Sequence, residues 1–382
     1  MKKLFLVLLF ALIATPASAA SKPLTQIATL GDISSNAGLF IDKSTIYTFG
    51  NIESATMDAV ITSYDAKGIM IARNVIDSGG SDYFAAATSD GIGNIWFVGG
   101  VSPAVESQPV ETAAATAVNP DGITVEVIPT VRSDITTIVL WKFTLATGEL
   151  SRYSFAFSFP ILATGISADS KGVSAIGVYK NKTILQNFLI SANTNGKFSP
   201  AITIGGAGTV LNAIQRMSDG SIDLFGSSTE SLGGTKLVGK VDGVLIKVKS
   251  NKIAQVVRSS APKAIREWSS VGSSTFLMGT IQTGNKVEIA ATKFANFKPV
   301  WNVRYPSTGS VAGILNSSGA FLAYSTSAGM NLSTFSTKGV VGQVYNSAAI
   351  ARPLAMAYSK ELGIITLAEV GNQASIFTPT SG

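Results

Sequence analysis

The sequence contains no histidine and no cysteine, which removes the side chains that carry most nucleophilic and metal chemistry. Ser-His-Asp and Cys-His systems, imidazole-bound zinc or copper, and histidine-ligated haem are therefore excluded. Carboxylate, lysine, tyrosine and arginine chemistry remains. Glycosidase-type catalysis would need two carboxylates facing one pocket, roughly 5 to 9.5 Å apart.

The acidic residues are spaced as turn residues rather than as a facing pair. Asp90, Asp169 and Asp219 each lie one to three residues before a glycine, a position where aspartate commonly accepts hydrogen bonds from its own turn. Asp58 and Asp242 open predicted strands at matching positions of a repeated unit. Because equivalence between units indicates structure, we predict no catalytic residue.

Lys142, Lys247 and Lys293 recur within LWKF, LIKV and ATKF at similar offsets. A catalytic lysine would be unique rather than periodic, so we interpret these three as strand residues with solvated ammonium groups. Trp96, Trp141 and Trp301 also lie inside predicted strands. They are expected to pack between repeated units.

Arg266, Glu267 and Trp268, in AIREWSS, place three large groups where other units carry Ala, Gly or Ile. They are the candidate ligand-binding residues, because they could line a central channel. A core role is the alternative, and we favour it for Trp268.

Glycine pairs in this chain do not form a phosphate cradle. No GxxxxGK[ST] motif is present, and no helix pattern follows the pairs at 79–80, 205–206 and 233–234, so no helix N-terminus is available to an anion. The loops DGIGN at 90–94 and NPDG at 119–122 lack the acid density of a calcium loop. We predict no cofactor and no metal site.

The elements that must position these residues are strands. Short apolar or alternating runs, each closed by Gly, Asp, Asn or Ser, are typical of an antiparallel β-protein. A pattern of turn, apolar strand and glycine recurs. The five clear copies are STIYTFG, GNIWFVG, KGVSAIG, DGSIDLFG and SSTFLMG, and the two weak copies are SGAFLAYS and ELGIITLAEVG.

A strand pair with a tight turn follows most copies, and glycine stands where a hairpin needs positive φ, at 68, 148, 196 and 339. Each unit thus supplies four strands in about 50 residues, and such a sheet buries its faces only by stacking on neighbours. We predict an all-β fold, a β-propeller of seven four-stranded blades.

The chain ends predict how the ring closes. The last unit, from Pro353, lacks an outer strand, whereas PLTQIATLG at 23–31 resembles an outer strand with no unit before it. We expect this N-terminal strand to pair with ASIFTP and remove the free edge. The alternative is an N-terminal tail that frays.

Residues 1–19 read as a signal peptide, with two lysines, an apolar run and Ala17-Ser18-Ala19 as a cleavage site. The apolar run is too short to cross a bilayer. We therefore expect a secreted or extracytoplasmic protein, periplasmic or at the cell surface, that does not span the membrane. Residues 20–382 are expected to form one β-propeller domain.

An insertion at 101–134 interrupts the repeat between the second and third strands of its unit. Long connections in compact domains are usually functional or disordered. We predict a flap that contacts a protein or glycan, and a mobile decoration is the alternative.

The formal net charge is +6, and no run of three basic residues occurs after the signal peptide. This charge pattern does not favour nucleic acid as a partner. We expect a monomer.

The stretch GGSDYFAAATSDGIGNIWFVGG at 79–100, followed later by DGVLIKVKSNKI from Asp242, resembles the repeat of bacterial exported β-propellers. That repeat runs Gly-Gly, Asp, small residues, Asp-x-x-Gly-Asn, an aromatic strand and Gly. The resemblance implies a secreted or surface-exposed binding scaffold and brings no shared catalytic residues.

Two functions are therefore open. The first is an exported, non-enzymatic propeller that binds a protein or a cell-envelope polysaccharide. The second is a carbohydrate-active enzyme, a glycoside hydrolase or lyase, that uses carboxylate or tyrosine chemistry on one propeller face. The periodic placement of the acidic residues favours the first.

Overall fold

A computed structural model describes residues 21–31, 33–103, 131–273, 276–317 and 319–379. Every regular element within these ranges is a β-strand, 28 in all. No helix that could cross a membrane occurs among the described residues. The sequence-based prediction of an all-β chain is therefore confirmed.

Strand pairing divides the described strands into groups of four. Five groups are separate sheets, and the eight-stranded sheet consists of two further groups joined between β25 and β1 by a short parallel pairing. We name these seven groups blades 1 to 7.

Blade 1 contains β2 (Ser35–Asp42), β3 (Thr45–Glu53), β4 (Met57–Tyr64) and β5 (Met70–Ile76). Blade 2 contains β6 (Asp82–Ser89), β7 (Asn94–Val101), β8 (Thr137–Thr144) and β9 (Leu150–Ala156). Blade 3 contains β10 (Ile161–Asp169), β11 (Gly172–Asn181), β12 (Ile184–Asn193) and β13 (Ile202–Ile204). Blade 4 contains β14 (Thr209–Arg216), β15 (Ile222–Ser228), β16 (Asp242–Lys249) and β17 (Lys252–Ser259). Blade 5 contains β18 (Ile265–Ser273), β19 (Phe276–Thr283), β20 (Lys286–Ala295) and β21 (Lys298–Pro306). Blade 6 contains β22 (Val311–Asn316), β23 (Gly319–Thr326), β24 (Gly329–Phe335) and β25 (Val341–Ser347). Blade 7 contains β26 (Pro353–Ser359), β27 (Ile364–Glu369), β28 (Ala374–Pro379) and β1 (Lys22–Leu30).

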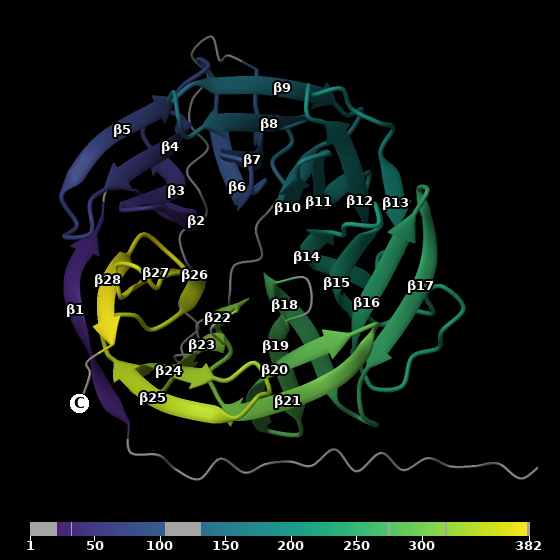
Figure 1. Ribbon diagram of the computed structural model, residues 1–382. Coiled ribbons are helices and arrows are strands. Elements are labelled where there is room, and N and C mark those ends of the chain that lie inside the picture. The colour runs from purple at the N-terminus through teal and green to yellow at the C-terminus, as the bar shows by residue number, and fades with distance from the viewer. Residues whose placement is uncertain (1–20, 32, 104–130, 274–275, 318, 380–382) are drawn as a thin grey trace, which may run out of the picture.

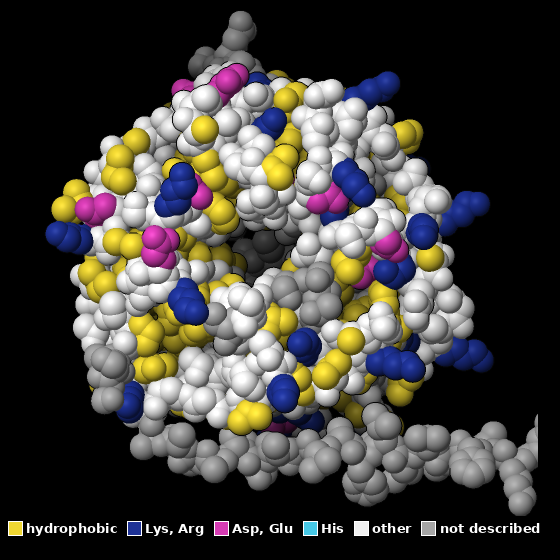
Figure 2. Space-filling model, viewed as in Figure 1, with side chains coloured by type: hydrophobic (Ala, Val, Ile, Leu, Met, Phe, Trp, Pro, Cys, Tyr) yellow, Lys and Arg dark blue, Asp and Glu magenta, His cyan; other side chains and the backbone are white. Residues whose placement is uncertain are grey.

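The blades stand around a central axis, with the first strand of each innermost (Figure 1). These inner strands contact one another in chain order, and β2 of blade 1 contacts β26 of blade 7, so the ring is complete. Figure 2 shows a hollow at the centre of one face, with basic and acidic side chains spread around it. The predicted β-propeller is confirmed.

The N-terminal strand closes the ring as predicted. β1 pairs antiparallel with β28, from Leu24 opposite Pro379 to Leu30 opposite Ala374, and the two strands lie side by side in Figure 1. Leu24 and Leu30 are buried in the core of this region. β1 thus pairs with the strand edge that the last unit would otherwise leave without a partner.

A bulge in the inner strand explains the glycine that ends each clear repeat. The glycine lies in the second strand opposite a residue of the inner strand, and the register shifts immediately after that residue. A Cβ at the glycine would meet the preceding carbonyl oxygen of the inner strand at 1.6 to 2.3 Å. The five glycines are Gly50, Gly99, Gly177, Gly226 and Gly279. Blade 6, a weak copy, pairs β22 with β23 without a shift.

Large side chains fill the spaces between blades. Trp96 packs with blade 3 residues and Trp141 with blade 1 residues, and both are almost fully buried. Trp301 of blade 5 stacks on Phe335 of blade 6, with ring centroids 5.9 Å apart. The predicted inter-blade packing of these three tryptophans is confirmed.

Candidate functional site

The three predicted turn aspartates hold their own turns. The Asp90 carboxylate accepts hydrogen bonds from the backbone of Ile92 and Asn94, at 2.9 and 3.1 Å. Asp169 accepts from Lys171 and Gly172 at 2.8 and 3.0 Å. Asp219 accepts from the backbone nitrogen of Ser221 at 3.0 Å. Each carboxylate therefore has a structural role, as the sequence predicts.

Asp58 and Asp242 likewise cap the start of a third strand. Asp58 accepts from the hydroxyls of Ser54 and Thr56. Asp242 accepts from two backbone nitrogens, and Arg258 pairs with it at 3.1 Å inside the blade. Both carboxylates therefore have structural partners.

The three periodic lysines do occupy equivalent strand positions, but their neighbours differ. The residue three places before the repeat glycine lies opposite Lys142 in blade 2, Lys247 in blade 4 and Lys293 in blade 5. This residue is Trp96 in blade 2 and Phe276 in blade 5. In blade 4 it is Asp223, so Lys247 is the one of these three lysines that lies opposite a carboxylate.

A row of polar side chains therefore crosses the four strands of blade 4. The register places Gln215 opposite Asp223, Asp223 opposite Lys247, and Lys247 opposite Gln255. Directly paired residues present their side chains on the same face of a sheet. This face is turned toward blade 5.

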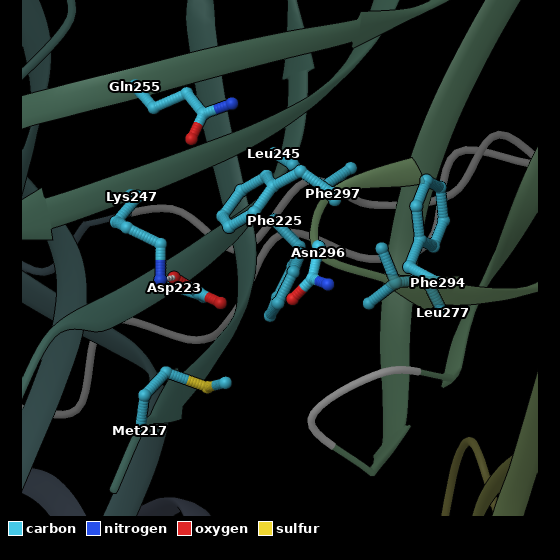
Figure 3. Close-up of a pocket in the computed structure, with 10 residues that line it drawn as sticks. All are labelled: Met217, Asp223, Phe225, Leu245, Lys247, Gln255, Leu277, Phe294, Asn296 and Phe297. Atoms are coloured by element: carbon cyan, nitrogen blue, oxygen red, sulfur yellow. Dashed lines mark ion pairs between the residues drawn. The ribbon is translucent and has the colours of Figure 1, made fainter. Parts of the chain in front are cut away.

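A pocket opens at the end of this row, between blades 4 and 5 (Figure 3). Its volume is about 360 Å³. Apolar and aromatic side chains form most of the wall, and Asp223, Lys247 and Gln255 stand on one side of it. The lining residues are Met217, Asp223, Phe225, Leu245, Lys247, Gln255, Leu277, Phe294, Asn296 and Phe297. We call this the blade 4/5 pocket.

An ion pair between Lys247 and Asp223 lies at one side of the pocket. Lys247 Nζ lies 3.3 Å from Asp223 Oδ1 and donates a hydrogen bond to Ser221 Oγ at 3.0 Å. The ammonium also stands over the Phe297 ring, 4.9 Å from its centroid. The side chain of Asp223 is 6% exposed and that of Lys247 is 21% exposed. The pocket thus places a carboxylate and an ammonium side by side.

Burial raises the pKa of Asp223, and the nearby Lys247 ammonium opposes this shift. Asp219 behaves in the opposite way, because hydrogen bonds from Ser221 lower its pKa. An apolar site with a perturbed carboxylate is a common setting for ligand binding. Among the residues that line the pocket, Asp223 is the single carboxylate.

Phe297 reaches the pocket from a tight hairpin turn between β20 and β21. Asn296 and Phe297 have φ of 49° and 61°, the pattern of a type I′ turn. A phenylalanine in the left-handed region costs of order 1–2 kcal/mol. Contacts with the blade 4/5 core and with Lys247 hold the ring in place.

The side chains of Arg266, Glu267 and Trp268, which are consecutive in β18, have different environments. Trp268 is fully buried in the core between blades 4 and 5 and packs edge-on against Phe294, a residue of the pocket wall. Glu267 is exposed. Arg266 lies 4.4 Å from the Trp268 ring, and burial lowers its pKa to about 10. None of the three lines the blade 4/5 pocket, although Trp268 belongs to the same inter-blade core, so the favoured core role for Trp268 is confirmed.

Most of the insertion at 101–134 lies outside the described residues, which stop at Pro103 and resume at Val131. Its role as a flap stays a prediction. The strand connections around the blade 4/5 pocket, after β14 and between β20 and β21, are at the opposite strand ends from the β7–β8 connection that carries the insertion.

No metal cluster was found in the described part of the chain, where no group of three or more acidic side chains converges.

Comparisons with known proteins identify the fold. No family model and no curated protein matches this chain. Among solved structures, it is similar to the β-propeller domain of Cps50 (Swd1) from Myceliophthora thermophila, with 10% identity, a TM-score of 0.54, and coverage of 94% of this chain and 100% of that one. It is also similar to the WD40 domain of Pan2 from Neurospora crassa, with 9% identity, a TM-score of 0.53, and coverage of 96% and 99%. At such identities the similarity concerns the fold alone.

Asp223 was not among the residues predicted from the sequence, although the sequence contains a signal for it. When the clear repeats are aligned on their glycine, the third residue before it is Tyr47, Trp96, Ser174, Asp223 and Phe276 in successive blades. A carboxylate is the exception in this series. The pairing of Asp223 with Lys247 could be found only once the strand register was known.

Proposed function

We propose that this protein is an exported, non-enzymatic scaffold that binds an uncharged glycan of the cell envelope in the blade 4/5 pocket. Residues 1–19 have the pattern of a signal peptide, and the repeat at 79–100 resembles that of bacterial exported propellers. Both observations support export, and the pocket supports the choice of ligand.

The observation that carries the proposal is the combination of a neutral ion pair with an aromatic wall. Asp223 and Lys247 compensate each other's charge, so the pocket favours a ligand with no net charge. Carboxylate and amide oxygens accept hydrogen bonds from hydroxyls, while the ammonium and the amide nitrogens of Gln255 and Asn296 donate them. Each hydroxyl of a sugar can both donate and accept a hydrogen bond.

Phenylalanine rings suit the apolar face of such a ring. Phe225, Phe294 and Phe297 contribute to the pocket wall, and Phe297 is half-buried. A sugar whose C–H face lies on Phe297 would present its hydroxyls to Gln255 and to the ion pair. The volume of about 360 Å³ suits one or two sugar units of a longer chain.

Hydrolysis of the bound glycan is the second candidate function, and the pocket supports it less well. A glycosidase of the common type needs two facing carboxylates, whereas the pocket wall contains one. We expect binding without turnover.

A glycan array carrying neutral and acidic cell-envelope oligosaccharides tests the proposal. The mature protein should bind neutral structures, and Asp223→Ala and Gln255→Ala should each weaken binding by about tenfold or more, the equivalent of about 1.4 kcal/mol. Lys142→Ala is the control outside the pocket, because Lys142 occupies in blade 2 the strand position that Lys247 occupies in blade 4, opposite Trp96 instead of a carboxylate.

Two array results would contradict the proposal: binding confined to acidic glycans, or neutral hits that bind Asp223→Ala and Gln255→Ala unchanged. Incubating each hit with the protein and analysing it by mass spectrometry separates binding from cleavage. Shortened products would favour the enzyme.

A further inference from the structure

A second, uncharged recess lies between blades 2 and 3, beside the outer strand β9. The segment YSFAFSFP at 153–160 carries an aromatic residue at every second position. Tyr153 and Phe155 lie on one side of β9, and Phe157 and Phe159 follow in the connection after it. All four rings lie beside residues of blade 3. The four aromatic residues are Tyr153, Phe155, Phe157 and Phe159.

Each ring of this series meets another aromatic ring. Tyr153 stacks on Trp96 and Phe155 contacts Phe198, with centroids 5.9 and 5.6 Å apart. Phe157 contacts Phe188 at 4.9 Å. Phe159, the last ring, stacks on Tyr179 at 5.8 Å, and its side chain is 36% exposed. The series therefore begins against the core of this region and ends at the surface.

The recess has a volume of about 330 Å³, and no charged residue lines it. The strands β9, β11, β12 and β13 and the connection after β9 contribute its walls. We call it the blade 2/3 groove. An uncharged wall favours an uncharged occupant, because a charged group would lose its hydration without gaining a partner.

The polar groups at the groove already bond to one another. Tyr179 Oη donates to Gln186 Oε1 at 2.6 Å and lies 3.1 Å from Thr203 Oγ1. A sugar has many hydroxyls to satisfy, and this wall has few polar groups to offer them. An apolar occupant needs no such polar partners. The blade 2/3 groove therefore favours a different class of ligand from the blade 4/5 pocket.

The neighbouring strand edge suits an extended chain. β13 is three residues long and pairs with β12 only from Asn187 to Leu189. The start of β12 extends beyond it, with Ile184 53% exposed on the same face as Gln186 and Phe188. Apolar surface therefore continues from the groove along an uncovered piece of strand.

We propose that the blade 2/3 groove binds an extended, uncharged peptide segment of a partner protein, with apolar side chains at alternate positions. Such a peptide repeats its side chains every two residues, the same period as Ile184, Gln186 and Phe188 along the edge of β12. Peptides that extend a sheet at an exposed strand edge gain main-chain hydrogen bonds, and pockets for alternate side chains provide specificity. This site is independent of glycan binding in the blade 4/5 pocket.

Selection from a phage-displayed random dodecapeptide library on the immobilised mature protein tests this proposal. The enriched peptides should have no net charge and apolar residues at alternate positions. A synthetic peptide from the enriched pool should bind Phe159→Ser and Tyr179→Ala at least about tenfold more weakly than the wild type, as expected for central interface aromatics. Ile69→Ser, which removes an apolar side chain of blade 1 that is 63% exposed, should bind as the wild type does.

Thermal melting of each variant separates loss of the fold from loss of the site, and Phe159→Leu supplies a milder change should Phe159→Ser unfold. The proposal is overturned if no sequence is enriched, if the enriched peptides are charged, or if Phe159 and Tyr179 variants bind them unchanged. Binding of neutral oligosaccharides that is lost in Phe159→Ser but kept in Asp223→Ala would also overturn it, since the groove would then be a glycan site.

Discussion

At the scale of single residues, Asp223 occupies a position that is unfavourable for stability, and we propose that it binds ligand. Its carboxylate is buried, its pKa is raised, and it lies where other blades place an aromatic or serine side chain. Such a group lowers stability when it is ionised. Proteins often retain a costly polar group where binding needs it.

The pH dependence of stability tests this cost. Because the folded-state pKa of Asp223 is raised, the protein gains stability as this group protonates and loses it as the pH rises through that pKa. We expect Asp223→Asn to have a higher free energy of unfolding than the wild type at pH 7. The difference should vanish near pH 3, where the wild-type carboxyl is largely neutral as well.

Asp219→Asn is the control, for which we expect a change in stability of opposite sign. Urea denaturation at pH 7 and pH 3 measures the free energy of unfolding of both variants. The pKa of Asp219 is lowered by Ser221, so its contribution to stability is present above the unfolded pKa and is lost as the pH falls. The variant should be less stable than the wild type at pH 7, with a smaller difference at pH 3. Equal pH dependence of both variants would contradict the assigned shifts.

The repeat glycines offer a second prediction at this scale. A Cβ at Gly226 would lie 1.9 Å from the carbonyl oxygen of Val210, so Gly226→Ala must displace backbone at the bulge. We expect it to lower the free energy of unfolding by at least about 2 kcal/mol. Gly31→Ala, where no atom lies within 4 Å of the new Cβ, should change it little. Similar denaturation midpoints would show that the bulge tolerates a side chain.

At the scale of elements, the sequence predicted the strands well, because alternation and turn residues are local signals. The predicted hairpin glycines at 68, 148, 196 and 339 all have positive φ. The turn at Asn296 and Phe297 carries no glycine and so gives no such signal, although its φ values are of the same type. Inter-blade side-chain pairs, such as Phe297 with Lys247, were beyond prediction because they depend on register and on the rotation between blades.

The closing strand β1 gives the prediction at this scale. Deleting residues 20–31 removes the buried Leu24 and Leu30 and exposes the edge of β28. A chain that begins at residue 32 should melt well below one that begins at residue 20, since a single buried leucine typically contributes about 2–5 kcal/mol. Equal melting temperatures in calorimetry would mean that the ring is stable without this strand.

At the scale of the whole molecule, the ring presents two dissimilar recesses. The blade 4/5 pocket contains an ion pair and amide groups, whereas the blade 2/3 groove is aromatic and uncharged. A closed ring without disulfides can hold both because every blade packs on two neighbours. We infer a protein that can engage an envelope glycan and a protein partner at once.

Export is a property of the whole molecule with its own test. If residues 1–19 are a signal peptide, the protein recovered from the extracytoplasmic fraction should begin at Ala20, because Ala17-Ser18-Ala19 precedes the cleavage point. Mass spectrometry of the intact N-terminus measures this directly. A chain that begins at Met1 and remains in the cytosol would contradict export and the proposed envelope ligand.

A crystal structure of the protein with the best array-binding oligosaccharide would show directly whether the blade 4/5 pocket holds a neutral sugar. We expect a sugar ring against Phe297, with hydroxyls within hydrogen-bond distance of Asp223 and Gln255. A well-ordered oligosaccharide bound elsewhere on the ring, with the blade 4/5 pocket containing only water, would contradict this expectation.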